Sequence, residues 1–439
     1  MSAKDLSILI PARNEEFLSK TIEDILSNIE ADTEVIAVLD GAWADPAISQ
    51  HPRVVVVYLP ESIGQRASTN LACKLSKAKY VAKVDAHCSF DKGFDRKMLD
   101  AFKETGDNVV MVPVMRNLHC FDWVCKCGFT HYQDKGSMCP ECKQEMTKKM
   151  IWQPRRGTRN YAYCFDAEPH FQYMSNYRNR KEFKEGAKIG LTETMSLQGS
   201  FFMMTREKYW ELNIGDEKFG SWGSQGIQIA CSFWLTGGRV MVNHKSWYSH
   251  MFRTKQANGF GFPYPQSGRQ VDNAKKYAGE LFFENKFPNQ TRSLSWLIKR
   301  FAPIPGWGKE ELARIKRFDL PAQSGTFVTT PTSSNGVGTG KLVPSTTEGL
   351  PGIESGRGIS SHHIVSGKSQ NEMGGVATMG SIAKVVENLD VRPSSAGDRT
   401  DEPRIHKTVD VDGLMAKGSE TVAIGAYTTS PEPAPSNPI

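Results

Sequence analysis

The stretch Lys79-Tyr-Val-Ala-Lys-Val-Asp85-Ala86-His87-Cys88 decides the fold class, because it joins a strand signal to two metal-ligand side chains. Residues 80–85 predict a β-strand, since apolar and β-branched residues recur and neither Gly nor Pro interrupts them. Asp85 and His87 follow at the C-terminal end of this strand, where open α/β sheets bind ligands. A carboxylate beside an imidazole suits Mn2+ (or Mg2+), which could hold a nucleotide diphosphate. The alternative is a strand end followed by a solvated turn.

Strand and helix signals alternate on both sides of this stretch. We expect strands at 6–12, 33–39, 54–59, 80–85 and 108–114, and helices at 17–29, 63–77 and near 94–103. This alternation is typical of an α/β protein with a parallel, doubly wound sheet whose site lies at the strand C-termini. No GxGxxG follows the first strand, which argues against a dinucleotide cofactor.

Composition is that of a globular protein with a polar tail. Of the 439 residues, 39% are hydrophobic and 23% charged, and the formal net charge of +6 permits a phosphorylated or nucleic-acid partner without requiring one. The N-terminal residues show no signal-peptide pattern, and no apolar run reaches the roughly 18–20 residues of a membrane span. We therefore expect a cytoplasmic protein with no membrane span.

Residues 118–150 interrupt the alternation with two close cysteine pairs. Cys125-Lys-Cys127 and Cys139-Pro-Glu-Cys142 are separated by a loop of eleven residues. Two such pairs predict a tetrahedral structural Zn2+ site that would hold together an insertion too small to fold alone. Because Cys-x-Cys is less usual than Cys-x-x-Cys, one ligand could be replaced by a neighbour, for which the candidates are Cys120, His119 and His131.

The segment 151–188 is rich in Arg, Lys, Tyr and Asn. Basic residues interleaved with aromatic ones could bind an anionic acceptor or single-stranded nucleic acid. They could equally form a solvated rim held by a few aromatic anchors.

An ordered series of motifs follows in residues 196–253: QGSF at 198–201, WGSQ at 222–225, TGG at 236–238 and HMFR at 250–253. Together with the Asp-x-His pair, this series resembles the metal-dependent glycosyltransferases of the GT-A fold in family 2. Among these, it is most similar to the polypeptide N-acetylgalactosaminyltransferases. The resemblance covers roughly residues 5–255, apart from the cysteine-rich insertion. It implies a Rossmann-like mixed α/β sheet and transfer of a sugar from a nucleotide diphosphate donor, a UDP-sugar, to an acceptor hydroxyl.

The resemblance also implies roles for individual residues. His250 would complete the metal site of Asp85 and His87, and Arg253 would reach the diphosphate as a charge-assisted donor. Trp222 and Gln225 would frame the sugar. The residues implied for the nucleotide are Pro11, Arg13, Asn14 and Glu15 after the first strand, Asp40 after the second, and Arg66 and Asn70 in the helix opened by Gly64. Without the resemblance, His250 would be interpreted as a core or surface histidine, and Arg253 as a surface arginine.

One position departs from the family pattern. Gln225 stands where the family usually has an acid after Trp-Gly, and an amide cannot act as a general base. An inverting transferase needs such a base, whereas a retaining one can rely on the departing phosphate. The substitution therefore favours retention, although Asp216 or Glu217 could still supply a carboxylate.

The C-terminal part divides into a folded segment and a tail. We expect a transferase domain at 1–318, with helices at 294–301 and 309–317, and a mostly disordered tail at 319–439 rich in Ser, Thr, Gly and Pro. The Gly/Pro loop 256–270 is a candidate lid over the donor, and its alternative is a plain surface connection. The lectin module that often follows the catalytic domain in the resembled family is not evident, which argues against a glycopeptide acceptor and leaves the acceptor unknown.

Two other classes of function compete with this interpretation. A non-catalytic nucleic-acid-binding protein would use the cysteine-rich insertion and the Arg/Tyr-rich segment. A glycosyltransferase acting on modified DNA bases would combine both interpretations. A nucleotidyltransferase is disfavoured because the loop at 11–15 has one arginine, one acid and no glycine.

Overall fold

The computed structural model describes residues 4–133, 136–221, 223–252 and 269–319. Trp222, Arg253, the loop 256–268 and the tail 320–439 lie outside the described residues. The interpretations that fall on them stay predictions, and so does the domain boundary at 318.

The sheet is mixed, with strand order β11-β13-β6-β12-β4-β1-β2-β3. Strands β1, β2, β3 and β4 are parallel neighbours, and β6 is parallel to β13. Strand β12 runs antiparallel to β4 and β6, and β11 runs antiparallel to β13. The bounds are Leu6–Ala12 for β1, Thr33–Asp40 for β2, Val54–Leu59 for β3, Tyr80–Val84 for β4, Val109–Val124 for β6, Leu191–Glu193 for β11, Phe201–Thr205 for β12 and Arg239–His250 for β13. The sheet confirms the α/β class and the mixed sheet that the resemblance implies. The parallel pairing expected from alternating strands and helices holds for β1 to β4, whereas β11 and β12 run antiparallel to their neighbours.

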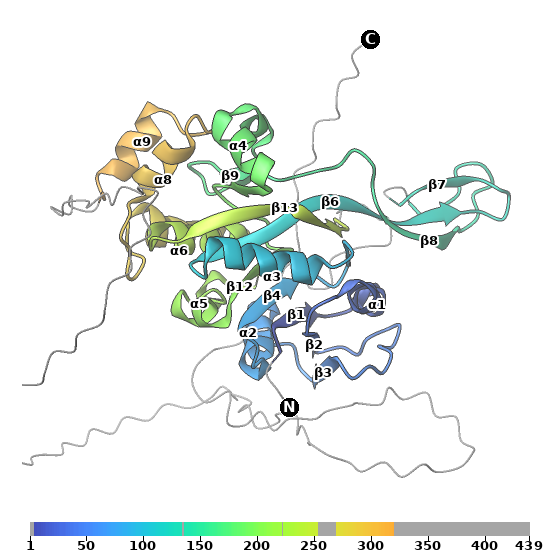
Figure 1. Cartoon of the computed structure of the whole chain (residues 1–439). Coiled ribbons are helices and arrows are strands. Elements are labelled where there is room, and N and C mark those ends of the chain that lie inside the picture. Colours follow the sequence, from blue (N-terminus) through green and yellow to red (C-terminus); the bar gives the residue numbers. More distant parts are fainter. Residues whose placement is uncertain (1–3, 134–135, 222, 253–268, 320–439) are drawn as a thin grey trace, which may run out of the picture. The chain divides into compact units, whose positions relative to one another are not determined.

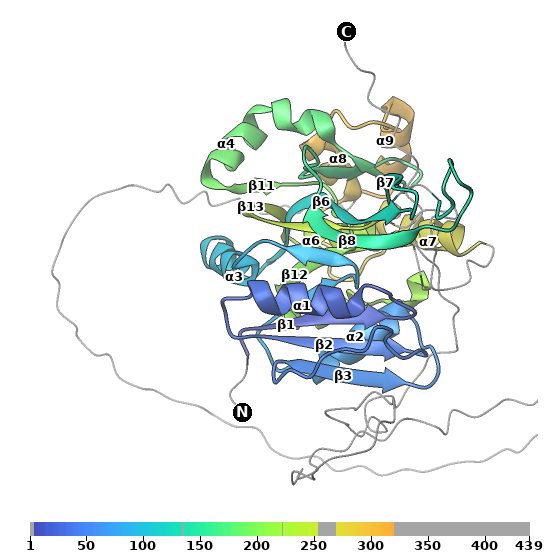
Figure 2. The same ribbon diagram turned by 90° about the vertical axis from the view of Figure 1, so that its right-hand side faces the viewer.

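Helices cover both faces of this sheet. Alternate strand residues such as Ile8, Ala37 and Val84 pack with α1 (Leu18–Asn28) and α3 (Phe94–Thr105) in one apolar cluster. The intervening residues, such as Leu9 and Val38, pack in a second cluster with α2 (Gln65–Leu75) and α6 (Gln225–Leu235). This is the period of two that a sheet buried on both faces requires. Figures 1 and 2 show α1 beside β1 in both views.

The remaining elements follow the sheet or connect its strands. They are β5 (Cys88–Phe90), β9 (Tyr163–Phe165), β10 (Phe171–Tyr173), α4 (Lys181–Ile189), α5 (Arg206–Glu211), α7 (Gln270–Ala278), the π-helix η3 (Gly279–Phe283), α8 (Leu294–Phe301), α9 (Lys309–Lys316) and the 3-10 turns η1 (Ser175–Asn179) and η2 (Glu217–Phe219). Helix α8 begins at the cap Ser293, whose side chain accepts from the Trp296 backbone N–H. The helices expected at 294–301 and 309–317 are confirmed. Among the helices of the described residues, none is both long enough and apolar enough to cross a membrane.

The cysteine-rich insertion is an extension of the sheet. Strand β6 runs for 16 residues, well past the expected end at residue 114, and pairs antiparallel with β7 (Thr130–Tyr132) and β8 (Thr147–Pro154). We call residues 118–154 the ribbon. Figure 1 shows β6 continuing from the sheet into β7 and β8. The strand expected at 108–114 is therefore longer than predicted, because one continuous strand belongs to both the sheet and the ribbon.

Candidate metal and nucleotide site

Three strand ends bring the predicted metal ligands together. Asp85 and His87 follow the last residue of β4, and His250 is the last residue of β13. Strand β5 pairs antiparallel with β13 and places Cys88 opposite His250. In addition, the Met251 backbone N–H donates to the His87 carbonyl oxygen at 3.1 Å. The residue pairing of β5 with β13 therefore fixes the two histidines side by side.

The ligand atoms of this triad are close and shielded from solvent. His250 Nε2 lies 3.2 Å from Asp85 Oδ2, and His87 Nε2 lies 3.9 Å from the same oxygen. One ligand atom from each residue lies within 4.8 Å of the others, and the exposed fractions of Asp85, His87 and His250 are 4%, 2% and 1%. A carboxylate and two imidazoles at these separations fit a borderline divalent cation such as Mn2+.

Lys83 is a further charged group at the triad that the sequence interpretation missed. It is 1% exposed, and its Nζ pairs with Asp85 Oδ1 and donates to the Gly199 carbonyl oxygen at 2.9 Å. The available signal was a lysine inside an otherwise apolar buried strand, since a charge there requires a partner.

The charges of the triad suit metal binding. Burial opposes ionisation of Asp85, but the Lys83 ammonium and the hydrogen bond from His250 outweigh it and hold the pKa of this carboxyl well below its usual range. Burial lowers the pKa of His250 to about 4. At neutral pH the site therefore presents a carboxylate and a neutral imidazole, the protonation states in which both act as ligands.

Glu15 contacts the triad rather than open solvent. Its Oε2 lies 3.2 Å from His87 Nδ1, on the ring edge away from Asp85, and its side chain is 8% exposed. A carboxylate on the second ring nitrogen fixes the orientation of a ligating histidine. Asn14, one residue earlier, has a φ of 48°, which turns the chain at the end of β1. Pro11 lies inside β1, opposite Val38 of β2.

Asp40 is buried at the end of β2 and organises the loop before α2. Its carboxylate accepts from the backbone N–H of Ile63 at 2.6 Å and of Gly64 at 3.0 Å, and from the Ser62 hydroxyl at 2.8 Å. Arg13 donates to the Asp40 carbonyl oxygen at 3.4 Å. Arg13 and Asp40 thus lie together at the C-terminal edge of β1 and β2, on the same side of the sheet as the triad.

Arg66 and Asn70 connect α2 to the segment before α6. The Arg66 guanidinium donates to the Gly223 carbonyl oxygen at 3.0 Å, next to position 222. Asn70 donates to the Gly215 carbonyl oxygen at 3.0 Å and to Glu217 Oε1 at 2.9 Å. Both side chains therefore position Gly215, Glu217 and Gly223, a role that sequence reasoning did not anticipate.

The start of α6 brings Gln225 against Gly199, the residue whose carbonyl oxygen accepts from Lys83. A Cβ added at Gly199 would stand 2.4 Å from Gln225 Oε1, so the amide lies directly against this glycine. Asp216 and Glu217, the two carboxylates that could replace an acid at position 225, both accept hydrogen bonds from other side chains. Asp216 accepts from the Tyr277 hydroxyl at 3.1 Å, and Glu217 accepts from Asn70.

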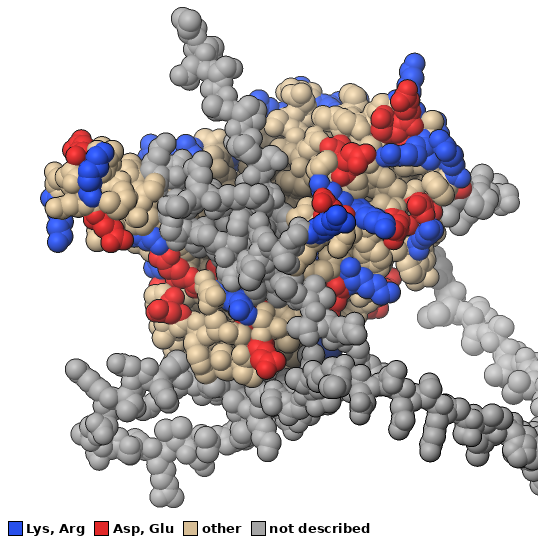
Figure 3. Space-filling model, turned by 180° about the vertical axis from the view of Figure 1, so that it is seen from behind, with Lys and Arg blue, Asp and Glu red and all other residues tan. Residues whose placement is uncertain are grey.

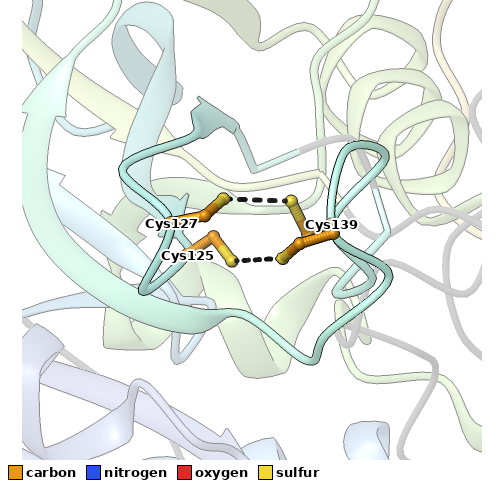
Figure 4. Close-up of side chains that lie close together, drawn as sticks. Cys125, Cys127 and Cys139 are labelled. Carbon is orange, nitrogen blue, oxygen red and sulfur yellow. Dashed lines mark hydrogen bonds between the residues drawn. The ribbon is translucent and has the colours of Figure 1, made fainter.

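The four predicted zinc ligands converge at the end of the ribbon. Cys125 Sγ lies 3.3 Å from Cys142 Sγ, and Cys127 Sγ lies 3.6 Å from Cys139 Sγ. All four sulfurs lie within 4.8 Å of one another. Figure 4 shows Cys125 and Cys127 on one loop pointing toward Cys139 on the facing loop. Burial would raise the pKa of Cys139, but hydrogen bonds from the backbone of Cys142 and Glu141 and from the neighbouring thiols lower it to about 7.

The three alternative zinc ligands have other surroundings. Cys120 lies in the apolar core of the ribbon. His119 Nε2 lies 2.7 Å from Asp122 Oδ1, and His131 Nδ1 lies 3.1 Å from the Tyr132 carbonyl oxygen.

Part of the basic segment 151–188 is used inside the protein. Arg180 donates to the carbonyl oxygens of Phe301, Ala302 and Pro303 at 2.7–3.2 Å, and so holds the end of α8. The Arg155 guanidinium lies 5.0 Å from the Tyr132 ring centre. On the face drawn in Figure 3, Lys and Arg side chains alternate with Asp and Glu side chains rather than forming one continuous basic surface.

Comparisons with known proteins point to a glycosyltransferase. The model of the glycosyl transferase family 2 matches residues 7–124. Polypeptide N-acetylgalactosaminyltransferase 3 of Homo sapiens is 22% identical over 266 residues, which is 58% of this chain and 38% of the relative. The protein named "Putative polypeptide N-acetylgalactosaminyltransferase 13" of Drosophila melanogaster is 24% identical over 290 residues, which is 62% of this chain and 45% of the relative. The chain spans less than half the length of each of these two relatives.

A solved structure, GalNAc-T7 with UDP, GalNAc and Mn2+, superposes with a TM-score of 0.46 and 14% identity over 72% of this chain and 54% of that one. The family match and the curated relatives confirm the predicted resemblance: the chain resembles GT-A glycosyltransferases of family 2, and among them polypeptide N-acetylgalactosaminyltransferases.

Proposed function

We propose that the protein is a metal-dependent glycosyltransferase that moves a sugar from a UDP-sugar to an acceptor hydroxyl. The observation that carries the proposal is the buried triad of Asp85, His87 and His250 at the C-terminal edge of the sheet. Its position matches where α/β sheets bind nucleotides, and residues 7–124 match a glycosyltransferase family.

The triad would hold Mn2+ (or Mg2+), with Glu15 orienting His87. When bound, such an ion neutralises charge on a diphosphate and stabilises its departure. Arg13 and Asp40 lie at the same sheet edge and would contact the nucleoside, with Pro11 and Asn14 shaping the loop. We keep Arg253 as the predicted diphosphate contact and Trp222 as the predicted wall of the sugar site.

Retention of configuration is the stereochemical outcome that the side chains favour. Gln225 cannot accept the acceptor's proton as a general base. The carboxylates of Asp216 and Glu217 accept hydrogen bonds that hold α7 and α2, respectively. The donor's own phosphate oxygen would then accept the acceptor hydroxyl proton as the sugar–phosphate bond breaks.

A structural Zn2+ at Cys125, Cys127, Cys139 and Cys142 belongs to the same proposal. Four sulfurs converging from two loops are the donor set that tetrahedral structural zinc prefers.

Modified DNA bases remain a predicted acceptor class, because a basic and aromatic segment adjoins the ribbon. The non-catalytic nucleic-acid-binding alternative has less support, since Arg180, one of the basic residues on which it rests, holds α8. Both are tested by salt-dependent DNA binding with and without sugar turnover.

The proposal is tested by a thermal-shift panel of nucleoside diphosphates and their sugars, with and without Mn2+. We expect one UDP-sugar to raise the melting temperature only when metal is present, because ligands that bind the native state stabilise it. Asp85→Asn should abolish this shift, while Asp107→Asn, an exposed surface acid, should keep it. Stabilisation by DNA regardless of metal, with no nucleotide response, would contradict the proposal.

A further inference from the structure

The ribbon packs against the two segments that carry Glu15, the residue beside His87, and His250 of the triad. Its apolar core includes Phe121, Trp123 and Met146, and the same cluster contains Phe17 and Met251 from outside the ribbon. Phe17 and Met251 are both 1% exposed. Phe17 comes two residues after Glu15, and Met251 comes directly after His250. The ribbon core is therefore shared with the ends of the two segments that lead into the metal site.

Ring contacts and one ion pair extend this shared core. The Phe17 ring lies 6.1 Å from Phe121 and 6.0 Å from Trp152. Lys148 on β8 lies 5.7 Å from the Phe17 ring centre, and its Nζ donates to both carboxylate oxygens of Glu16 at 2.6 and 2.8 Å. Residues 15–17 thus face the triad through Glu15 and the ribbon through Glu16 and Phe17.

The ribbon has little means of holding this arrangement by itself. Two of the cluster members are the zinc-ligand candidates Cys125 and Cys139. Through them the sulfur site is part of the apolar core of the ribbon. An insertion of this size buries too little apolar surface to be ordered without a cross-link or a metal. Metal binding at the sulfurs would therefore supply the folding free energy of the ribbon.

We propose that zinc binding at the ribbon positions the donor site, with Lys148 and Phe17 as positioning residues that act through Glu15 and His250. The inference rests on the proposed donor-binding role of the triad. Loss of zinc should make residues 13–18 and 85–91 more mobile together, while strand β3, at the other edge of the sheet, stays ordered.

The test is amide hydrogen exchange on the full chain, without Mn2+ or nucleotide, comparing zinc-loaded protein, chelator-treated protein and Cys142→Ser. The zinc-loaded protein should contain one zinc per chain. In the other two samples, exchange at 13–18 and 85–91 should rise by roughly tenfold or more, while exchange at 54–59 in β3 stays unchanged.

Lys148→Met and Lys149→Met form the matched pair, because Lys149 is the exposed neighbour on the same strand. Lys148→Met should keep its zinc, raise exchange at 13–18, and weaken binding of Mn2+ with UDP by roughly 10–100-fold, the range seen for residues that orient metal ligands. Lys149→Met should behave as the natural protein.

Three outcomes overturn the inference: natural protein without stoichiometric zinc, unchanged exchange at 13–18 after zinc loss, or equal acceleration in all segments. A zinc effect on exchange in a protein that binds no nucleotide would support the positioning role and refute the proposed function, so the two failures are distinguishable.

Discussion

At the scale of single residues, the unexpected feature is a buried ammonium inside the metal site. Lys83 lies on β4 two residues before Asp85, which follows the end of this strand, and its Nζ pairs with Asp85 Oδ1. Without a bound cation, this lysine is the main positive charge that stabilises the buried carboxylate. Removing one partner of a buried ion pair leaves an uncompensated charge.

Lys83→Met keeps the length of the side chain and removes its charge. We expect the metal-free protein to lose about 3 kcal/mol of unfolding free energy, because Asp85 then lacks its counterion. The rise in melting temperature on adding Mn2+ should be larger than in the natural protein, since a cation now satisfies the carboxylate. Urea denaturation with and without Mn2+ measures both effects, with the exposed Lys92→Met as control. Equal stability of the two variants would contradict the role given to Lys83.

The buried imidazole of His244 makes the free energy of unfolding depend on pH. Burial lowers the pKa of His244 to about 4, and its Nε2 lies 2.8 Å from the Thr192 hydroxyl. The unfolded chain takes up the proton near pH 6.5, whereas the folded protein resists it until about pH 4. The stabilisation is therefore complete above about pH 6.5 and falls as the pH drops toward 4.

His244→Gln removes this titrating group and keeps a polar amide. We expect the natural protein to lose roughly 1–2 kcal/mol more than the variant between pH 6.5 and 4, after allowance for partial exposure. Chemical denaturation at several pH values measures the difference. Parallel pH profiles for the two proteins would show that His244 contributes nothing to acid sensitivity.

At the scale of elements, the start of α6 depends on close backbone approach. Gly226 lies one residue inside this helix, and a Cβ added there would stand 1.8 Å from the Leu197 carbonyl oxygen. The segment before β12 therefore touches the helix backbone directly, which is how Gln225 comes to lie against Gly199.

Gly226→Ala should destabilise the protein by about 2–3 kcal/mol, because a backbone contact cannot yield as a side chain would. Gly279→Ala is the matched control, since Gly279 is also helical and nothing lies within 4 Å of its added Cβ. This control should raise stability by about 0.5–1 kcal/mol through its effect on the unfolded chain. Thermal unfolding of both variants measures the difference, and a Gly226→Ala protein as stable as the control would refute the close approach.

At the scale of the whole molecule, the local patterns predicted most of the first half. The strands at 6–12 and 54–59 have the expected bounds, and the triad of Asp85, His87 and His250 meets as expected. These succeeded because apolar periodicity and residues at strand ends are local signals. The contacts of Arg66 and Asn70 could not be predicted in this way, because their partners lie about 145–157 residues away along the chain.

The other differences also come from tertiary contacts. The sequence 108–114 predicts a strand, but nothing local says that β6 continues to Val124, because that extension is stabilised by pairing with β8. The antiparallel entry of β12 between β4 and β6 likewise depends on a partner strand distant in sequence. Packing of the ribbon on Phe17 has no sequence signal for the same reason.

The most direct test of the central claim is anomalous diffraction at the manganese edge from crystals grown with UDP and Mn2+. We predict one peak at bonding distance, roughly 2–2.5 Å, from Asp85, His87 and His250, and no such peak in His250→Ala. A manganese peak elsewhere, or UDP bound without metal at this site, would contradict the account.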